Sequence, residues 1–255
     1  MQFKKDSQEF LEKKAFFDRL LTIYGRNATL EALKDNSIQI YRLHMTSSNK
    51  PAKVLTHIIN YAANRGVEVL YHDKKSLSRI SKNTKQDQGV ALDIVMPYAS
   101  GIDEFISLNS SYRIMALDGI TNPQNLGMII RSCAAGSIDA VLMPEKSNAQ
   151  MSALVIKASA GTLFKIPIIK TKSLHSALIT LKENNASLYI LSADARRAYR
   201  DEKYDSKSVF ILGNESSGVS LEVTELCDKS ISIPMHRGVE SLNVAVTAAL
   251  LAFME

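Results

Sequence analysis

The sequence is built from short stretches in which apolar and polar residues alternate and longer stretches in which apolar residues recur at helical spacing. The first of the longer stretches runs from Ser7 to Tyr24, where charged residues separate the apolar positions. This spacing predicts an amphipathic helix. We therefore expect residues 1–24 to form an N-terminal helical arm.

Residues 25–97 have the pattern of a small α/β domain. Alternating stretches predict strands, and stretches with helical spacing predict helices, one of which should stop at Gly66. The expected strands are 38–45, 67–71 and 89–96, and the expected helices are 51–65 and 74–81. Turn-forming residues then dominate residues 98–111, which predicts a linker to a second domain.

The second domain, residues 112–255, alternates strands with helices. Its first helix should begin at Pro123, because Asn122 can cap it and proline suits the first helical position. The expected strands are 112–117, 138–143, 164–169, 188–192 and 209–212, and the expected helices are 123–135, 151–160 and 174–184. This alternation predicts an α/β fold with a parallel sheet covered on both faces, in which ligands bind at the carboxyl ends of strands.

The end of the chain combines a short strand, a polar turn and a nearly all-apolar helix. Apolar and polar residues alternate from Ile231 to Met235, which predicts a strand that opens into a loop. Apolar residues then lie all round a helix from Leu242 to Phe253, so it should be buried by its own domain, by a partner subunit or by both. Three polar residues should form its first turn, where backbone N–H groups are free for a ligand: Glu240, Ser241 and Asn243.

Composition narrows the class of protein. With 45% hydrophobic and 22% charged residues the chain has the composition of an ordinary soluble protein. Its polar N-terminus and the lack of any long apolar stretch predict a cytoplasmic location without a membrane partner. The two cysteines, Cys133 and Cys227, are far apart and have no clustered histidine, so neither a disulfide framework nor a metal site is expected. A net charge of +5 favours a polyanionic partner such as nucleic acid.

The sequence lacks the motifs of two classes of nucleotide-binding protein. The segment Gly213–Gly218 stands at a strand end, but no Lys-Ser or Lys-Thr pair follows its second glycine, so it is not a phosphate-binding P-loop. No Gly-x-Gly-x-x-Gly follows a predicted strand either. The sequence therefore gives little support to a nucleotide hydrolase or a dinucleotide-dependent dehydrogenase.

Three segments at predicted strand ends carry a family resemblance. Asn-Leu-Gly-Met-Ile-Ile-Arg at 125–131, Leu-Gly-Asn-Glu at 212–215, and Ile-Pro-Met at 233–235 with Glu-Ser-Leu-Asn-Val at 240–244 occur in this order. They resemble the three motifs of the SpoU-type (TrmH-like) branch of the SPOUT superfamily of RNA 2′-O-ribose methyltransferases. The resemblance covers residues 112–255, and residues 25–96 are more faintly similar to the substrate-binding domain that often precedes such catalytic domains.

The resemblance implies an α/β domain whose C-terminal chain forms a deep trefoil knot, a feature that general topology rules do not predict. It implies S-adenosylmethionine as cofactor, a homodimer, and transfer of a methyl group to a ribose 2′-hydroxyl of RNA. The residues that match the family's catalytic positions are Arg131, Asn125, Glu215, Ser241 and Asn243. Those that match its cofactor-binding positions are Gly213, Ile233, Met235 and Leu242.

Arg131 corresponds to the residue nearest the 2′-hydroxyl, which is proposed in the family to act as a base. An arginine side chain is almost always protonated, so orienting a phosphate or stabilising the developing alkoxide is chemically easier. Outside the motifs, basic side chains supply further candidates for RNA contact, with a solvated surface as the alternative. These candidates are Arg196, Arg197, Arg200, Lys74 and Lys75.

Two residues depart from the family pattern. Arg237 stands where glycine is usual two residues after Met235, and Ser216 replaces a common glycine after Glu215. Either change would alter cofactor binding if the position requires a positive φ angle. Two hypotheses follow: a ribose 2′-O-methyltransferase acting on large-subunit ribosomal RNA, with transfer RNA as the other substrate, or an RNA-binding protein of the same fold with weak or no catalysis.

Overall fold

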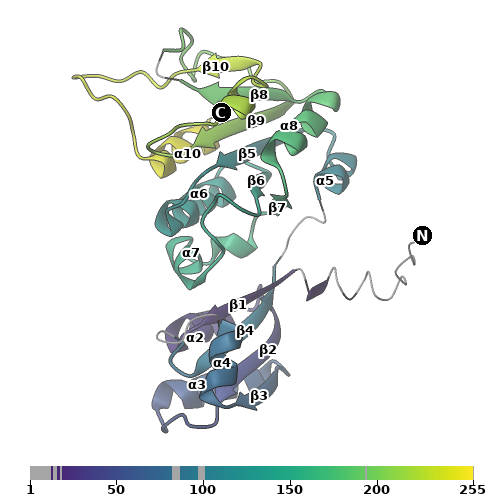
Figure 1. The fold of residues 1–255 in the computed structure, drawn as a ribbon, viewed down its shortest axis with the longest axis vertical. Coiled ribbons are helices and arrows are strands. Elements are labelled where there is room, and N and C mark those ends of the chain that lie inside the picture. Colours follow the sequence, from purple (N-terminus) through teal and green to yellow (C-terminus); the bar gives the residue numbers. More distant parts are fainter. Residues whose placement is uncertain are drawn as a thin grey trace. The chain divides into compact units, whose positions relative to one another are not determined.

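The computed structural model describes Lys13 and residues 16–17, 19–81, 87–96, 101–192 and 194–254. It divides the chain into two compact units, Met1–Met96 and Pro97–Glu255 (Figure 1). Each unit has its own sheet. Within the described ranges, no helix is long and apolar enough to span a bilayer.

The first unit is a four-stranded mixed sheet in the order β1-β4-β2-β3. Strand β4 pairs antiparallel with β1 and β2, and β2 pairs parallel with β3. The strands are β1 Leu20–Tyr24, β2 Gln39–Thr46, β3 Glu68–His72 and β4 Val90–Val95, and the helices are α2 Arg26–Lys34, α3 Lys53–Asn64 and α4 Lys74–Ser81. The predicted α/β unit is confirmed, and α4 has the predicted bounds.

The predicted helix from Ser7 to Tyr24 is wrong over its last five residues. Phe16 and Phe17 are helical, but Leu20–Tyr24 forms β1, whose residues pair with β4 from Leu20↔Val95 to Tyr24↔Ala91. Apolar spacing over so short a segment fits a strand as well as a helix, and the partner strand lies far along the chain. The beginning of the predicted helix, from Ser7, lies outside the described residues.

A row of hydrogen bonds crosses all four strands of this sheet. Thr22 Oγ1 on β1 donates to Asp93 Oδ1 on β4 at 2.6 Å, and Asp93 Oδ2 lies 2.9 Å from His44 Nε2 on β2. His44 Nδ1 in turn lies 3.0 Å from His72 Nε2 on β3. Burial alone would raise the pKa of the Asp93 carboxyl, but hydrogen bonds with His44 and Thr22 lower it below its usual range. These histidines therefore brace the sheet.

The second unit is built on a six-stranded sheet in the order β10-β8-β9-β5-β6-β7, and all its pairings are parallel. The strands are β5 Tyr112–Asp118, β6 Ala140–Pro144, β7 Ile168–Thr171, β8 Ser187–Leu191, β9 Lys207–Gly213 and β10 Lys229–Ile231. The helices are α5 Ile102–Leu108, α6 Pro123–Ala135, α7 Ala153–Ala158, α8 Leu174–Glu183, α9 Leu221–Thr224, α10 Val244–Ala252 and the 3₁₀ helix η1 Thr162–Phe164.

Helices cover both faces of this sheet, as predicted. Helix α6 contacts α7 and α10 on one face, and α8 contacts α5 and α9 on the other (Figure 1). Asn122 caps α6, with its side chain accepting hydrogen bonds from the backbone of Gln124 and Asn125. Strands β5 and β9 lie in the middle of the sheet and are almost completely buried. The site can therefore form at their carboxyl ends, on a rigid base.

Three sequence predictions for the second unit need correction. Helix α5 lies inside the predicted linker 98–111, because Phe105 is buried and packs against Tyr112 with ring centroids 5.6 Å apart. The strand predicted at 164–169 begins only at Ile168, since Phe164 belongs to η1. The strand predicted from Ile231 to Met235 ends at Ile231, the first residue of the predicted alternation.

The last helix also begins later than predicted. Asn243 is its N-cap and α10 starts at Val244, so Glu240 and Ser241 lie in the preceding loop rather than in a first helical turn. The chain runs from the edge strand β10 through residues 232–243 to α10, which packs against α6 and β9 (Figure 1). The trefoil knot that the family resemblance implies stays a prediction.

Candidate functional site

The candidate site is built on the carboxyl ends of the two central strands. Asp118 at the end of β5 is the register partner of Gly213 at the end of β9. The turn after β9 is closed by two backbone hydrogen bonds between Asn214 and Gly218, of 3.0 and 2.9 Å. A Cβ atom at Gly213 would lie 2.2 Å from the backbone of Gly218, so this turn requires glycine there.

Asn125 links the three sequence motifs through its side chain. Its Nδ2 donates to Glu215 Oε1 in the turn after β9, and its Oδ1 accepts a hydrogen bond of 3.2 Å from Asn243 Nδ2. Asn243 also caps α10 by accepting from the backbone of Ala245 at 2.9 Å. Asn125 itself is buried in the first turns of α6. An amide suits this position because it can donate to a carboxylate and accept from a second amide at the same time.

The other two predicted catalytic residues do not join this cluster. Arg131 lies six residues after Asn125 on α6, so the two side chains point about 120° apart around the helix axis. Its side chain is exposed and makes no hydrogen bond or ion pair with the residues that the structure describes. Ser241 is exposed in the loop before α10. Among the described residues Arg131 is therefore an unpaired cation, and it lies on the helix that also carries Asn125.

The predicted cofactor residues lie at the same end of the sheet, where Gly213 ends β9 and the loop 232–243 follows β10. In this loop Ile233 and Met235 are half-buried, and Leu242 is 37% exposed. The backbone groups of Ile233, Met235 and Leu242 make no hydrogen bond within the described part of the chain. Free backbone donors and acceptors beside partly covered apolar side chains suit a heteroaromatic ring such as adenine, so these residues fit the cofactor that the sequence implies.

The two departures from the family pattern have different structural consequences. Arg237 has a φ angle of 60° and is followed by Gly238 at 73°, so an arginine occupies a left-handed backbone conformation that favours glycine. Among the described residues Ser216 is not one of the non-glycine residues with a positive φ angle. The doubt about Ser216 is therefore removed, whereas the backbone at Arg237 is strained.

Replacing Arg237 with glycine is expected to raise the free energy of unfolding by about 0.5 to 1 kcal/mol. Relief of a left-handed conformation stabilises the folded state by about 1 to 2 kcal/mol, and the added freedom of glycine in the unfolded chain offsets part of this gain. Urea unfolding of Arg237→Gly beside the wild type measures the difference. Unchanged or lower stability would show that the Arg237 side chain offsets the strain through contacts of its own.

Three residues that support the site were missed by the sequence analysis. Asp118 Oδ2 accepts from the backbone of Ser220 at 2.8 Å, and Asn214 Nδ2 donates to the carbonyl of Gly119 at 2.8 Å. The buried Asn148 donates to the carbonyl of Leu117 at 3.1 Å. These bonds fix the strand ends against each other. Asp118 could have been found as the polar residue that ends a buried strand.

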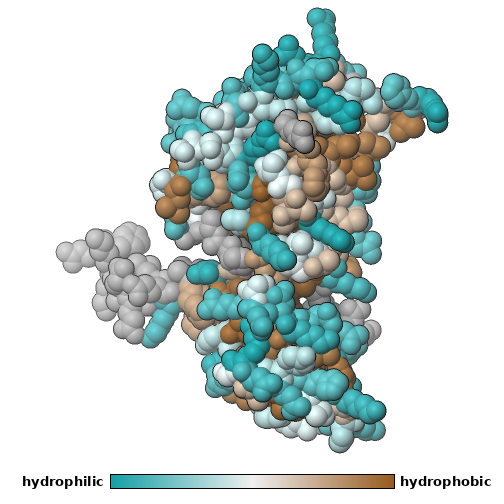
Figure 2. Space-filling view, turned by 180° about the vertical axis from the view of Figure 1, so that it is seen from behind, coloured by the Kyte–Doolittle hydropathy of each residue, from teal (hydrophilic) through white to brown (hydrophobic). Residues whose placement is uncertain are grey.

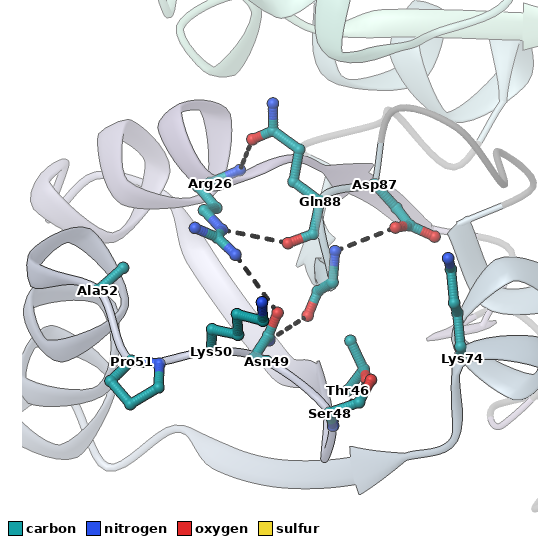
Figure 3. A pocket seen from close by; sticks show the side chains of 11 residues that line it. Arg26, Thr46, Ser48, Asn49, Lys50, Pro51, Ala52, Lys74, Asp87 and Gln88 are labelled. Atoms are coloured by element: carbon teal, nitrogen blue, oxygen red, sulfur yellow. Dashed lines mark hydrogen bonds between the residues drawn. The ribbon is translucent and has the colours of Figure 1, made fainter.

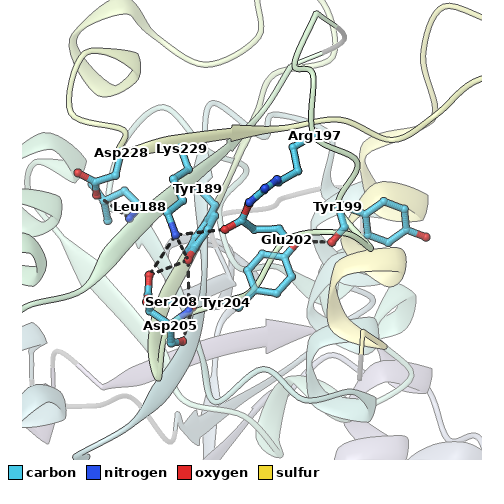
Figure 4. A network of polar contacts seen from close by, with 10 residues as sticks. All are labelled: Leu188, Tyr189, Arg197, Tyr199, Glu202, Tyr204, Asp205, Ser208, Asp228 and Lys229. Carbon is cyan, nitrogen blue, oxygen red and sulfur yellow. Dashed lines mark hydrogen bonds and ion pairs between the residues drawn. The ribbon is translucent and has the colours of Figure 1, made fainter.

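The arginines in the segment 194–206, between β8 and β9, have different environments. Arg197 pairs with Glu202 at 3.0 Å, and Lys229 reaches the other oxygen of this carboxylate at 3.1 Å (Figure 4). Hydrogen bonds from Arg197 and Lys229 hold the pKa of Glu202 below its usual range. Arg200 donates to Tyr199 Oη at 2.8 Å, whereas Arg196 is exposed without a bonded partner in the described ranges. Arg196 is thus the freest of these cations.

The remaining candidates for RNA contact, Lys74 and Lys75, are the first two residues of α4 in the first unit and are exposed.

The described ranges give no support for a metal site or a reactive thiol. They contain no group of three or more His, Cys, Asp or Glu side chains able to hold a metal ion. Burial raises the pKa of the Cys133 thiol to about 12, and burial beside Asp228 raises that of Cys227 to about 11.

The fold and the order of the motif segments define a methyltransferase of the SPOUT type. The profile of the SpoU rRNA methylase family matches residues 112–253, and the profile described as RNA 2′-O ribose methyltransferase substrate binding matches residues 22–99. The chain belongs to the SpoU rRNA methylase family, and it is an RNA methyltransferase of the SpoU/TrmH type.

A relative agrees with this assignment, and solved structures share the fold. A tRNA/rRNA methyltransferase from Mycobacterium leprae, described as uncharacterized, is 31% identical over 236 residues, which cover 91% of this chain and 76% of the relative. The SpoU methyltransferase AviRb from Streptomyces viridochromogenes, solved in complex with AdoMet, superposes with a TM-score of 0.69 at 19% identity, covering 97% of this chain and 96% of AviRb. An AdoMet-bound rRNA methyltransferase from Sinorhizobium meliloti gives 0.65 at 20% identity, covering 94% and 88%.

Proposed function

We propose that this protein transfers the methyl group of S-adenosylmethionine to a ribose 2′-hydroxyl of large-subunit ribosomal RNA. The observation that carries the proposal is the side chain of Asn125, which joins Glu215 and Asn243 from the other two motifs. The substrate-binding profile over residues 22–99 names the same reaction, and the AdoMet-bound structural neighbour from Sinorhizobium meliloti is an rRNA methyltransferase. Transfer RNA remains the other substrate, because the curated relatives are described as tRNA/rRNA methyltransferases.

The cofactor would be held by Gly213 and by Ile233, Met235 and Leu242, with backbone groups recognising adenine and apolar side chains covering it. When bound, it supplies an electrophilic methyl group. The protein then has to align the ribose oxygen with that methyl group, so positioning supplies much of the rate. The Asn125 cluster fixes the strand-end loops in which Glu215 and Asn243 lie.

Arg131 would act on the RNA rather than on the cofactor. Its guanidinium is a cation that is free of protein partners in the described part of the chain. It can donate two hydrogen bonds to a phosphate beside the target nucleotide, and it can stabilise negative charge that develops on the 2′-oxygen. Ser241, in the loop before α10, would contact the same nucleotide.

A second function, RNA binding with weak or no catalysis, is favoured by the strained backbone at Arg237 in the cofactor loop. A titration of the purified protein with S-adenosylmethionine separates the two functions. The methyltransferase proposal predicts saturable binding at micromolar cofactor, retained in Arg131→Ala and weakened in Leu242→Asp. Binding of RNA without measurable binding of the cofactor would favour the second function.

We also propose that the protein is a cytoplasmic homodimer in which α10 lies at the interface. Although Ala248 and Leu251 are buried on the inner side of α10, Val246 is 48% exposed and Phe253 is 61% exposed. A cavity of about 600 Å³ lies between this outer side and residues 199–204. Figure 2 shows hydrophobic surface gathered on one side of the second unit. A second copy of the chain would cover this surface.

Replacing Phe253 with glutamate is expected to raise the dissociation constant of the dimer at least tenfold. A charge in a desolvated apolar contact costs more than the roughly 1.4 kcal/mol that corresponds to a factor of ten. Sedimentation equilibrium of the full chain measures the constant. Leu221→Glu is the matched control, because Leu221 is an exposed leucine on α9, across the sheet from α10. A wild-type monomer, or equal weakening by both variants, would contradict the interface.

A further inference from the structure

A cavity of about 730 Å³ opens in the first unit, where β2 and β3 end and α2 and α4 begin (Figure 3). Its lining includes Arg26 at the start of α2, Asn49 and Lys50 in the turn after β2, Lys74 at the start of α4, and the 87–89 turn before β4. Its volume lies in the range of sites that bind small molecules and nucleotide groups.

The wall of this cavity is fixed by hydrogen bonds between distant segments. Arg26 Nε donates to the carbonyl of Gln88 at 3.1 Å, and the Arg26 backbone donates to Gln88 Oε1 at 3.1 Å. Asn49 Nδ2 donates to the carbonyl of Gly89 at 2.8 Å, and a Cβ atom at Gly89 would lie 2.2 Å from Asn49 Oδ1. The cavity is therefore preformed, and a ligand need not order it on binding.

Its charge favours an anion. The described lining residues include three cations, Arg26, Lys50 and Lys74, and one acidic residue, Asp87. The carboxylate of Asp87 is buried and already accepts hydrogen bonds from the Gly89 backbone at 3.0 Å and from Ser81 Oγ at 3.2 Å. Lys50 and Lys74 are exposed, make no ion pair with described residues, and stand on opposite sides of the cavity (Figure 3). These two ammonium groups are available to a ligand.

The lining suits a phosphate better than a base. Among the described residues that line the cavity there is no aromatic side chain on which a base could stack, but there are the hydroxyls of Thr46 and Ser48, which lie 2.7 Å apart. Hydroxyl, amide and ammonium donors are the groups that contact phosphate and sugar in nucleic-acid complexes. Contacts of this kind set the position of the RNA and carry no sequence information.

We propose that this cavity holds a backbone phosphate of the substrate RNA between Lys50 and Lys74 and so docks the RNA on the first unit. The inference rests on the proposed function for the identity of the ligand as RNA. Lys50 and Lys74 supply charge, and Ser48 and Thr46 supply hydroxyls. The hydrogen bonds among Arg26, Gln88, Gly89 and Asn49 hold in place the turn after β2 that carries Ser48 and Lys50.

The test is RNA binding by the full chain, measured without cofactor by fluorescence anisotropy on an unmodified large-subunit ribosomal RNA transcript over a series of KCl concentrations. The double variant Lys50→Gln/Lys74→Gln is expected to bind at least about tenfold more weakly than the wild type. Its slope of log K against log salt should be shallower by about 0.7 to 0.9 for each phosphate that the variant no longer neutralises. Lys34→Gln, at the other end of α2, is the control for removal of a charge and should keep the wild-type slope.

Because Lys50 and Lys74 are exposed, the double variant should melt at the wild-type temperature, and circular dichroism checks this. Affinity and slope equal to those of Lys34→Gln would overturn the inference, even if the wild type methylates RNA. Conversely, the double variant could bind RNA more weakly than the wild type while the wild type transfers no methyl group. This result would support RNA docking at the cavity and contradict the proposed function. Saturable binding of inorganic phosphate or AMP at micromolar concentration, with RNA affinity unchanged in the variants, would overturn the RNA proposal. The cavity would then be assigned to a free small molecule.

Discussion

Replacing Arg131 with alanine is expected to lower methyl transfer to RNA by about 100- to 1000-fold, the decrease that follows removal of one donor from a developing oxyanion. The side chain is exposed and bonds to no described residue, so its removal should not disturb the fold. The melting temperature and the affinity for S-adenosylmethionine should stay at the wild-type values. Initial rates of transfer from labelled cofactor to unmodified RNA measure the effect.

Two further variants make this result specific. Arg131→Lys keeps the charge but lacks the planar pair of donors, so it should recover only part of the rate. Lys165→Ala removes an exposed cation just before β7, away from the strand ends that carry the site, and should leave the rate unchanged. Equal rates for the wild type and Arg131→Ala would remove Arg131 from the reaction.

The second large effect is expected at Asn125, which the structure places between Glu215 and Asn243. Asn125→Asp keeps the size of the side chain but replaces the donor to Glu215 with a second carboxylate. Repulsion between the two carboxylates should separate the motif loops and lower the transfer rate by about 100-fold or more, since small displacements of positioning groups cost this much. Rates measured as for Arg131 test this directly.

Asn125→Ala distinguishes the removal of hydrogen bonds from the addition of repulsion. It removes two hydrogen bonds, each contributing about 0.5 to 1.5 kcal/mol, without adding a charge, so it should reduce both stability and rate less than Asn125→Asp does. Urea unfolding and methyl-transfer rates of the wild type, Asn125→Ala and Asn125→Asp give the order of their stabilities and activities. If alanine and aspartate had equal effects, the carboxylate of Glu215 would not lie against residue 125 in the working enzyme.

Local patterns in the sequence were sufficient for most of the fold. The cap and first residue of α6, at Asn122 and Pro123, follow from rules that act within one helical turn, and both are confirmed. The parallel sheet follows from the alternation of buried strands with helices. Strand β1 was missed because its identity depends on pairing with β4. No local pattern contains that information.

The candidate site, like the fold, could be predicted from local patterns only in part. The motifs pointed to Asn125, Glu215 and Asn243, but their contact depends on β5 and β9 being neighbours and on α10 returning to α6. The strained backbone at Arg237 became visible only as a dihedral angle, although the absence of glycine had marked the position. Asn148 was missed because a buried asparagine that holds a strand end has no sequence signature.

The central claim is methylation of a ribose 2′-hydroxyl in ribosomal RNA, and one experiment tests it most directly. The protein is incubated with labelled S-adenosylmethionine and either ribosomal or transfer RNA that lacks native modifications, and each RNA is then hydrolysed in alkali. A methylated 2′-oxygen blocks hydrolysis of the adjacent bond, so we predict label in alkali-resistant dinucleotides from large-subunit ribosomal RNA. Arg131→Ala should form this label about 100- to 1000-fold more slowly. Label in mononucleotides would place the methyl group on a base and contradict the account, as would a protein that binds RNA and transfers no label to either RNA.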